Sequence, residues 1–221
     1  LKKRYGIPTA CVHDMGSGIC RAVNKVFPGV RDYICHFHFL RDIGKDYLEP
    51  AYQVIRHCLR QHAASSKLHS IARQARQELG EHADEASLLA DAIKQDSLAD
   101  SGLLPQAWAY SCALWIIQGK HAGDGYGFPF DHPLLAFATR LFTFDSIIEK
   151  LRSHCDPERK NPLFSKLAKL LSKIKNDRRF CMAVEELKWR TDIFDQLRKA
   201  MRIALPDGHN GLNPSFSALR I

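Results

Sequence analysis

Long apolar runs are missing from this 221-residue sequence. The densest apolar cluster, residues 113–117, is far shorter than the ~20 residues that a helix needs to cross a bilayer. The sequence does not open with a secretory signal, and its first residue is leucine instead of an initiator methionine. We therefore predict a cytoplasmic protein without a membrane partner, and we expect the chain to be an internal piece of a longer protein.

A disulfide framework and several familiar enzyme motifs are missing too. Seven cysteines, an odd number, are scattered without regular spacing, which predicts free thiols in a reducing compartment. The sequence has no P-loop, no dinucleotide-binding fingerprint, no nucleophile elbow and no paired-carboxylate hydrolase signature. None of these enzyme classes is indicated.

The net charge of +8 is concentrated in one part of the chain. Residues 150–202 hold 15 lysines and arginines against 7 aspartates and glutamates, whereas the remainder is balanced. Such a segment is typical of a protein that binds a phosphate backbone, and a solvated helix face in a basic protein is the alternative. The backbone-binding residues that we predict are Lys166, Lys169, Lys173, Lys175, Arg178 and Arg179.

The first part of the chain predicts a βαβ unit. Residues 9–13 and 33–37 are short β-prone runs, and apolar residues recur at helical spacing between them until Pro28 and Gly29. The two strands should be parallel and joined by a right-handed crossover. Two strands do not form a stable open sheet alone, so further strands are needed from elsewhere.

From residue 39 onward the apolar spacing is helical. Pro50 is expected to start a new helix, and Ser65 or Ser66 to cap the next one. A glycine-rich and aromatic loop is predicted over 120–131. The predicted fold class is mostly α with a small α/β part. The helices that we predict cover residues 39–47, 50–59, 65–79, 84–99, 105–117, 131–154, 161–174 and 177–205, with a loop from 206 to 214.

Asp14 is the strongest candidate for a catalytic residue. It directly follows the first predicted strand and precedes a glycine-containing turn into a helix. A carboxylate at the carboxyl end of a β-strand can bind Mg²⁺, and several of them can bind a metal pair for phosphoryl transfer. The alternative is that Asp14 only forms the turn before the helix.

Cys35 and His38 have the spacing of metal ligands, and Cys58 and His62 are four residues apart on a predicted helix. Together they would form a Cys₂His₂ zinc site. In the other interpretation, Cys35 packs in the core and His38 faces the same end of the sheet as Asp14.

Residues 14–45 resemble the DDE transposases of bacterial insertion sequences, specifically the Mutator-like group. The resemblance depends on Asp14, on the helix that ends at residues 27–29, and on Cys35–His38 with the residues that follow. Residues 125–131 and 197–202 also resemble members of an unclassified group of insertion-sequence transposases.

The resemblance implies a partial ribonuclease H-like catalytic core at 1–48, an all-helical insertion domain at 49–205 and a loop leading back to the core at 206–221. It makes Asp14 the second carboxylate of a catalytic triad and a ligand of Mg²⁺ or Mn²⁺. Cys35 and His38 are then the signature pair beside the active site, with His38 near the DNA. The complete enzyme would hold two metal ions, bind transposon ends and target DNA as a homo-oligomer, and act in the bacterial cytosol or nucleoid.

The sequence departs from this pattern in two places. Only eight residues precede Thr9, so the strand with the first aspartate is absent, and residues 215–221 offer no carboxylate for the final glutamate. Glu185 and Glu186 lie within the helical region and are poor substitutes. We expect this chain to be inactive alone. The alternatives are a non-enzymatic helical protein that binds DNA or another partner and has a zinc-stabilised amino-terminal part, and a degenerate remnant.

Overall fold

The structure, a computed structural model, describes residues 2–83 and 105–208. These residues form a mostly helical fold with one small, two-stranded parallel sheet, as the sequence predicts at this level. The helix predicted over 84–99 and the last part of the predicted closing loop lie outside the described residues. Among the helices that are described, none is long and apolar enough to span a membrane.

Contacts within the chain define two compact units. Unit 1 comprises the described residues of Leu1–Glu49, Asp124–Phe130 and Arg190–Ile221, and unit 2 comprises those of Pro50–Gly123 and Asp131–Trp189. The predicted domain boundaries near residues 48 and 205 stay a prediction.

Unit 1 begins with a short helix and the predicted βαβ unit: α1 (Lys2–Tyr5), β1 (Ala10–His13), α2 (Ser17–Val26) and β2 (Arg31–Ile34). The strands are parallel, and Cys11 pairs with Asp32 while Val12 pairs with Tyr33. The side chains of Val12 and Tyr33 share one face, where they are 66% and 47% exposed. The sheet therefore has an apolar face that is open to solvent.

The second strand is shorter than predicted. It ends at Ile34, and the long helix α3 (His36–Gln61) begins two residues later. The Cys35 N–H still donates to the His13 carbonyl (2.7 Å), and the Cys35 carbonyl then accepts from the Phe39 N–H (3.0 Å). Cys35 is thus the junction between strand and helix, and His38 lies in the first turn of α3 instead of following a strand directly.

Helix α3 also continues through Pro50, so the predicted helix start at this residue is wrong. Apolar residues recur at helical spacing on both sides of the proline, and Leu48, Ala51 and Ile55 are buried. We infer that this burial outweighs the lost backbone hydrogen bond, which costs about 3 kcal/mol for a proline inside a helix.

An aromatic cluster joins distant segments of unit 1. Phe130, which ends the loop 124–130, stacks on Phe37 of α3 with ring centroids 5.0 Å apart. Its ring also lies 5.8 Å from that of Phe194, which belongs to the last helix, α10 (Arg178–Met201). Gly44 allows this close approach, because a Cβ at residue 44 would lie 2.4 Å from Phe194 Cε2 and 2.7 Å from Pro129 Cγ.

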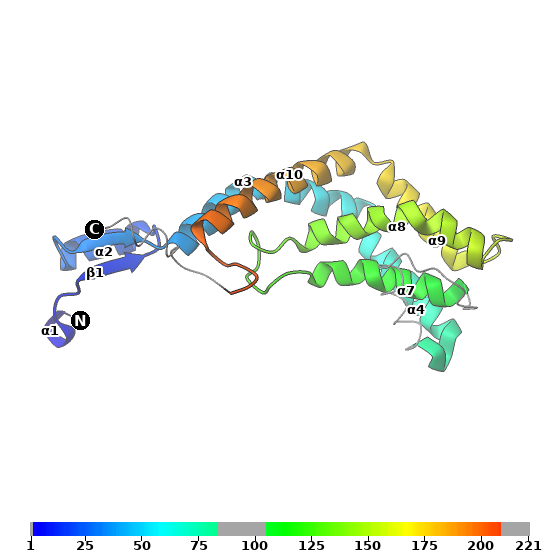
Figure 1. Cartoon of the computed structure of the whole chain (residues 1–221), viewed down its shortest axis with the longest axis horizontal. Helices are drawn as coiled ribbons and strands as arrows, with labels where there is room; N and C mark the ends of the chain where they lie inside the picture. The colour runs from blue at the N-terminus through cyan, green and yellow to red at the C-terminus, as the bar shows by residue number, and fades with distance from the viewer. Residues whose placement is uncertain (1, 84–104, 209–221) are drawn as a thin grey trace. The chain divides into compact units, whose positions relative to one another are not determined.

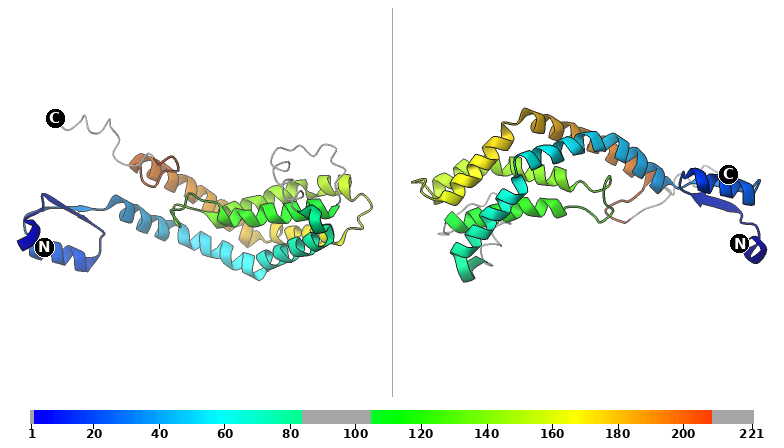
Figure 2. Two further views of the ribbon diagram at one scale, coloured as in Figure 1. Left: turned by 90° about the horizontal axis from the view of Figure 1, so that it is seen from below. Right: turned by 180° about the vertical axis from the view of Figure 1, so that it is seen from behind.

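The helices of unit 2 form a bundle. The described elements that lie wholly in it are α4 (Ala64–Leu79), η1 (Gly80–His82), α7 (Pro105–Gln118), η2 (Gly119–His121), α8 (Pro133–Cys155) and α9 (Pro162–Lys175). Helices α4, α7, α8 and α9 lie side by side (Figure 1), and both turned views in Figure 2 show the same grouping. The α9 face from Leu163 to Ile174 is buried, as its helical spacing predicts.

Helix caps in unit 2 follow the sequence in part. Asn161 accepts hydrogen bonds from the Leu163 and Phe164 N–H groups at the start of α9, as its position before a proline predicts. The predicted serine cap of α4 is wrong, because Ala63 takes that place in a left-handed conformation (φ 50°). Ser65 and Ser66 instead lie in the first turn of the helix.

Candidate metal and nucleic-acid sites

Asp14 lies where the sequence predicts, directly after β1 and before α2. Its Oδ1 accepts a hydrogen bond from the Gly16 N–H (3.1 Å). A Cβ at residue 16 would lie 2.9 Å from this oxygen, so a larger residue there would require the Asp14 carboxylate to shift. The structure thus places Asp14 in the turn-forming role that we considered as the alternative. Its other oxygen, Oδ2, accepts no hydrogen bond from the described part of the chain.

His13 and Asp32 form a pair beside Asp14 that the sequence analysis missed. His13 Nε2 lies 2.6 Å from Asp32 Oδ1, and His13 Nδ1 contacts the Asp14 carbonyl. The Asp14 carbonyl raises the pKa of His13 most, and the Asp32 carboxylate raises it further. The strand register could have indicated this pair, because Cys11 opposite Asp32 places His13 and Asp32 on the same face.

The predicted metal ligands divide between the two units. In unit 1 the rings of His38 and Phe37 are nearly perpendicular with centroids 5.7 Å apart, and His38 Nδ1 has no hydrogen-bond partner among the described residues. In unit 2, Cys58 and His62 both interact with Asp177 at the start of α10. Over residues 2–83 and 105–208, no three His, Cys, Asp or Glu side chains are grouped so that they could bind a metal ion.

Asp177 connects two helices of unit 2. Its Oδ2 lies 2.8 Å from His62 Nε2, and its Oδ1 accepts the Phe180 N–H (3.1 Å) in the first turn of α10. The hydrogen bond from His62 is the main reason that the pKa of Asp177 is lowered below its ordinary value of 3.8. The ionised carboxylate therefore stabilises the fold above that pH, and its contribution is lost as the pH falls through the lowered pKa.

Asp177→Ala is expected to lower the free energy of unfolding by about 2 kcal/mol at neutral pH, because it removes both the helix cap and the contact to His62. Asp177→Asn retains the helix cap, so its free energy of unfolding should fall by less than that of Asp177→Ala. Chemical denaturation of the variants measures both effects. Below pH 3.8 the free energies of unfolding of Asp177→Asn and of the unchanged protein should become more similar, since the carboxyl of Asp177 becomes protonated. A difference independent of pH would contradict a role for the charge.

Three of the predicted backbone-binding residues line one groove of about 320 Å³ between α4 and α9. Lys67, which the sequence analysis missed, contributes a fourth ammonium group from α4. No carboxylate lines the groove, and Lys166 Nζ donates to Gln74 Oε1 (2.8 Å) without losing its charge. We call this feature the lysine groove; the residues that line it are Lys67, Ser70, Ile71, Lys166, Lys169, Leu170 and Lys173.

The other predicted cations lie elsewhere in unit 2. Lys175 Nζ is 2.6 Å from Asp145 Oδ2, and this carboxylate raises the pKa of Lys175 while offsetting its charge. Arg178 and Arg179 line a different hollow at the start of α10, and Glu186 contributes a negative charge there. The structure therefore singles out Lys166, Lys169 and Lys173 from the predicted set.

The separate stretches of the resemblance meet in unit 1. Phe37, between the two residues of the signature pair, stacks on Phe130 of the loop. Arg198 donates from Nη1 to the Phe130 carbonyl (3.2 Å), and its guanidinium lies over the rings of Tyr126 and Phe130. These contacts give the loop and the end of α10 a structural role.

No protein-family model, curated protein sequence or solved structure matches this chain.

Proposed function

We propose that this chain is part of a DDE-type transposase, which cuts and joins DNA strands with the help of Mg²⁺ or Mn²⁺. The proposal treats the βαβ unit as a piece of a ribonuclease H-like core and unit 2 as a helical part that binds DNA. The observation that carries the DNA-binding part is the lysine groove. The enzyme class depends on the resemblance of residues 14–45, 125–131 and 197–202.

The lysine groove suits a phosphate backbone. Its four ammonium groups come from two packed helices, and no carboxylate lines it. The side chains of Lys67, Lys169 and Lys173 are exposed, so they can reach phosphates without a change in the fold. Lysine contacts of this kind position a protein on DNA and contribute affinity without reading the base sequence.

The geometry of Asp14 supports the catalytic part of the proposal less strongly than the lysine groove supports the DNA-binding part. One of its oxygens is engaged by Gly16, and the other could serve as a single ligand of a hard cation. The neighbouring Asp32 is paired with His13. The described residues therefore do not fit a complete two-metal site. We expect this chain to bind DNA without cutting it.

The role of Asp14 can be tested with Mn²⁺ as the probe, by electron paramagnetic resonance or calorimetry. We expect weak binding, with a Kd in the millimolar range, that Asp14→Asn abolishes. Asp46→Asn is the matched control, because Asp46 is an exposed aspartate on α3. Unchanged Mn²⁺ binding in Asp14→Asn would remove the metal-binding role of this residue.

Measurements of bound zinc and Mn²⁺ on the same chain distinguish the transposase from the non-enzymatic alternative. DNA binding that depends on the lysine groove, together with stoichiometric zinc lost in Cys58→Ala, would favour a helical DNA-binding protein. Mn²⁺ binding lost in Asp14→Asn, without bound zinc, favours the transposase. Each result is obtained on the full chain.

A further inference from the structure

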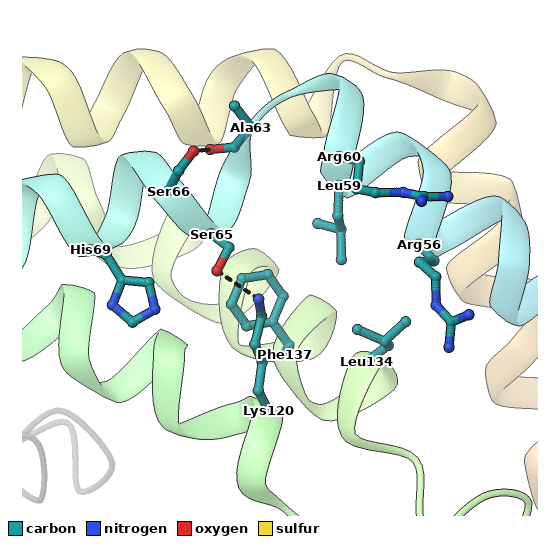
Figure 3. Close-up of a pocket in the computed structure, with 10 residues that line it drawn as sticks. All are labelled: Arg56, Leu59, Arg60, Ala63, Ser65, Ser66, His69, Lys120, Leu134 and Phe137. Atoms are coloured by element: carbon teal, nitrogen blue, oxygen red, sulfur yellow. Dashed lines mark hydrogen bonds between the residues drawn. The ribbon is translucent and has the colours of Figure 1, made fainter.

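A cavity of about 500 Å³ lies in unit 2, where α3 ends and α4 begins, and η2 and α8 complete its walls. Its lining includes two arginines, a lysine, a histidine and two serines, and no carboxylate. Figure 3 shows these side chains around the cavity. The residues that line it are Arg56, Leu59, Arg60, Ala63, Ser65, Ser66, His69, Lys120, Leu134 and Phe137.

Lys120 is held in a fixed position in this cavity. Its Nζ donates to Ser65 Oγ (2.7 Å) and lies 4.9 Å from the centre of the Phe137 ring. In Figure 3 the lysine side chain runs along Phe137 toward Ser65. Partial burial lowers the pKa of Lys120, so its charged form lacks part of its hydration. An anion that contacts the ammonium group would restore that stabilisation.

Two further cations line the same cavity, and in Figure 3 their side chains extend away from Lys120. Arg56 and Arg60 are one helical turn apart on α3, and neither forms an ion pair with a carboxylate of the described residues. Arg56 lies over the Tyr52 ring at 5.2 Å and bonds to Gln53 at 3.4 Å, which leaves guanidinium donors unused. Three uncompensated cations suit a doubly charged anion better than a singly charged one.

The remaining walls are apolar. Leu134 is partly exposed and offers an apolar surface for an uncharged group, whereas Leu59 is 7% exposed and Phe137 is 0% exposed with Lys120 over its ring. A volume of about 500 Å³ lies within the range of small-ligand sites, roughly 300–1,000 Å³. Inorganic phosphate alone would leave most of this space unfilled.

We propose that this cavity binds the phosphate monoester of a nucleotide-sized ligand, with Lys120 at the phosphate, the exposed side chains of Arg56 and Arg60 turning toward it on binding, and Leu134 against the rest of the molecule. The site is separate from the lysine groove and does not depend on the proposed transposase activity. The phosphate monoester can belong to a free mononucleotide or to the end of a nucleic-acid strand.

Calorimetric titration of the full chain tests the proposal with adenosine 5′-monophosphate, adenosine and inorganic phosphate as probes. We expect the monophosphate to bind at least about tenfold more tightly than adenosine, because a charge-assisted contact contributes about 1.5–3 kcal/mol. The monophosphate should also bind more tightly than inorganic phosphate, since its adenosine part adds contact with the apolar lining of the cavity. Equal affinity for the monophosphate and adenosine would overturn the proposal.

Variants locate the binding in this cavity. Lys120→Met and the exposed Arg60→Gln should each weaken binding of the monophosphate about tenfold or more. Lys188→Gln, an exposed lysine that lines neither this cavity nor the lysine groove, removes the same charge and should have no effect. Because Arg60 is exposed, its replacement tests the site even if Lys120→Met fails to fold. Equal weakening by Lys188→Gln would show unspecific attraction to the net charge and refute the site.

A single-stranded oligonucleotide with and without a 5′-phosphate distinguishes the two sources of the ligand. A preference for the phosphorylated strand that disappears in Arg60→Gln supports the site and identifies a strand end. Dependence on Arg60 for the mononucleotide alone supports the site and identifies a free nucleotide. If neither probe depends on Arg60 or Lys120, the proposal is wrong. Variants of the lysine groove report on DNA binding separately, so the failure of one proposal leaves the other intact.

Discussion

Replacing Arg198 with methionine is expected to lower the free energy of unfolding by about 3–5 kcal/mol, as the loss of one partner from a buried charged contact does. The side chain is almost fully buried and contacts the carbonyls of Phe130 and Ala204. It also lies 3.5 Å from Asp195 and 3.8 Å from Asp124. Methionine fills similar space but leaves these oxygens without their donor.

Lys199→Met is the matched control for Arg198→Met. Lys199 is the next residue on α10 but is exposed, so its replacement should change stability by less than about 0.5 kcal/mol. Urea denaturation, followed by circular dichroism, measures both variants. A loss below about 1 kcal/mol for Arg198→Met would mean that the loop 124–130 does not depend on this side chain.

Replacing Lys67, Lys169 and Lys173 together with glutamine is expected to weaken DNA binding about a hundredfold at moderate salt. Each lysine that contacts a phosphate displaces a condensed counterion, so the slope of log affinity against log salt should fall by about 2 to 3. Fluorescence anisotropy with a labelled duplex over a range of salt concentrations gives both quantities. The loss should be similar for duplexes of unrelated sequence, since backbone contacts do not read bases.

A second triple variant removes the same charge outside the groove. Lys25, Lys188 and Lys199 are exposed and do not line it. Their replacement with glutamine should leave the salt slope nearly unchanged. If both triple variants weaken binding equally, net charge alone explains the affinity and the lysine groove is not a DNA site.

Local sequence signals predicted much of the secondary structure. Asn161 followed by a proline correctly predicted the start of α9, and Gly80 and Gly119 correctly predicted where α4 and α7 end. The helix start predicted at Pro50 was wrong, because the burial of residues on either side outweighs the local effect of the proline on the helix. The predicted cap at Ser65 or Ser66 was wrong because the chain turns into α4 at Ala63, in a left-handed conformation that alanine rarely adopts.

The candidate sites were predicted less completely, because their residues come from segments that are distant in the sequence. The spacing of Lys166, Lys169 and Lys173 correctly predicted a shared face of one helix. Lys67 could not be added without knowing that α4 packs against α9. The cavity around Lys120 had no sequence signal at all, since Arg60, Ser65 and Lys120 are brought together only by the bundle.

Gly44 has a consequence for how this protein can diverge. The space that its missing side chain leaves is filled by Phe194 and Pro129, which come from two other segments of the chain. A larger residue at position 44 can be accommodated only if the side chains at positions 194 and 129 both shift or become smaller in the same lineage. Substitutions at these three positions should therefore be correlated in descendants of a common ancestor, whichever activity each descendant retains.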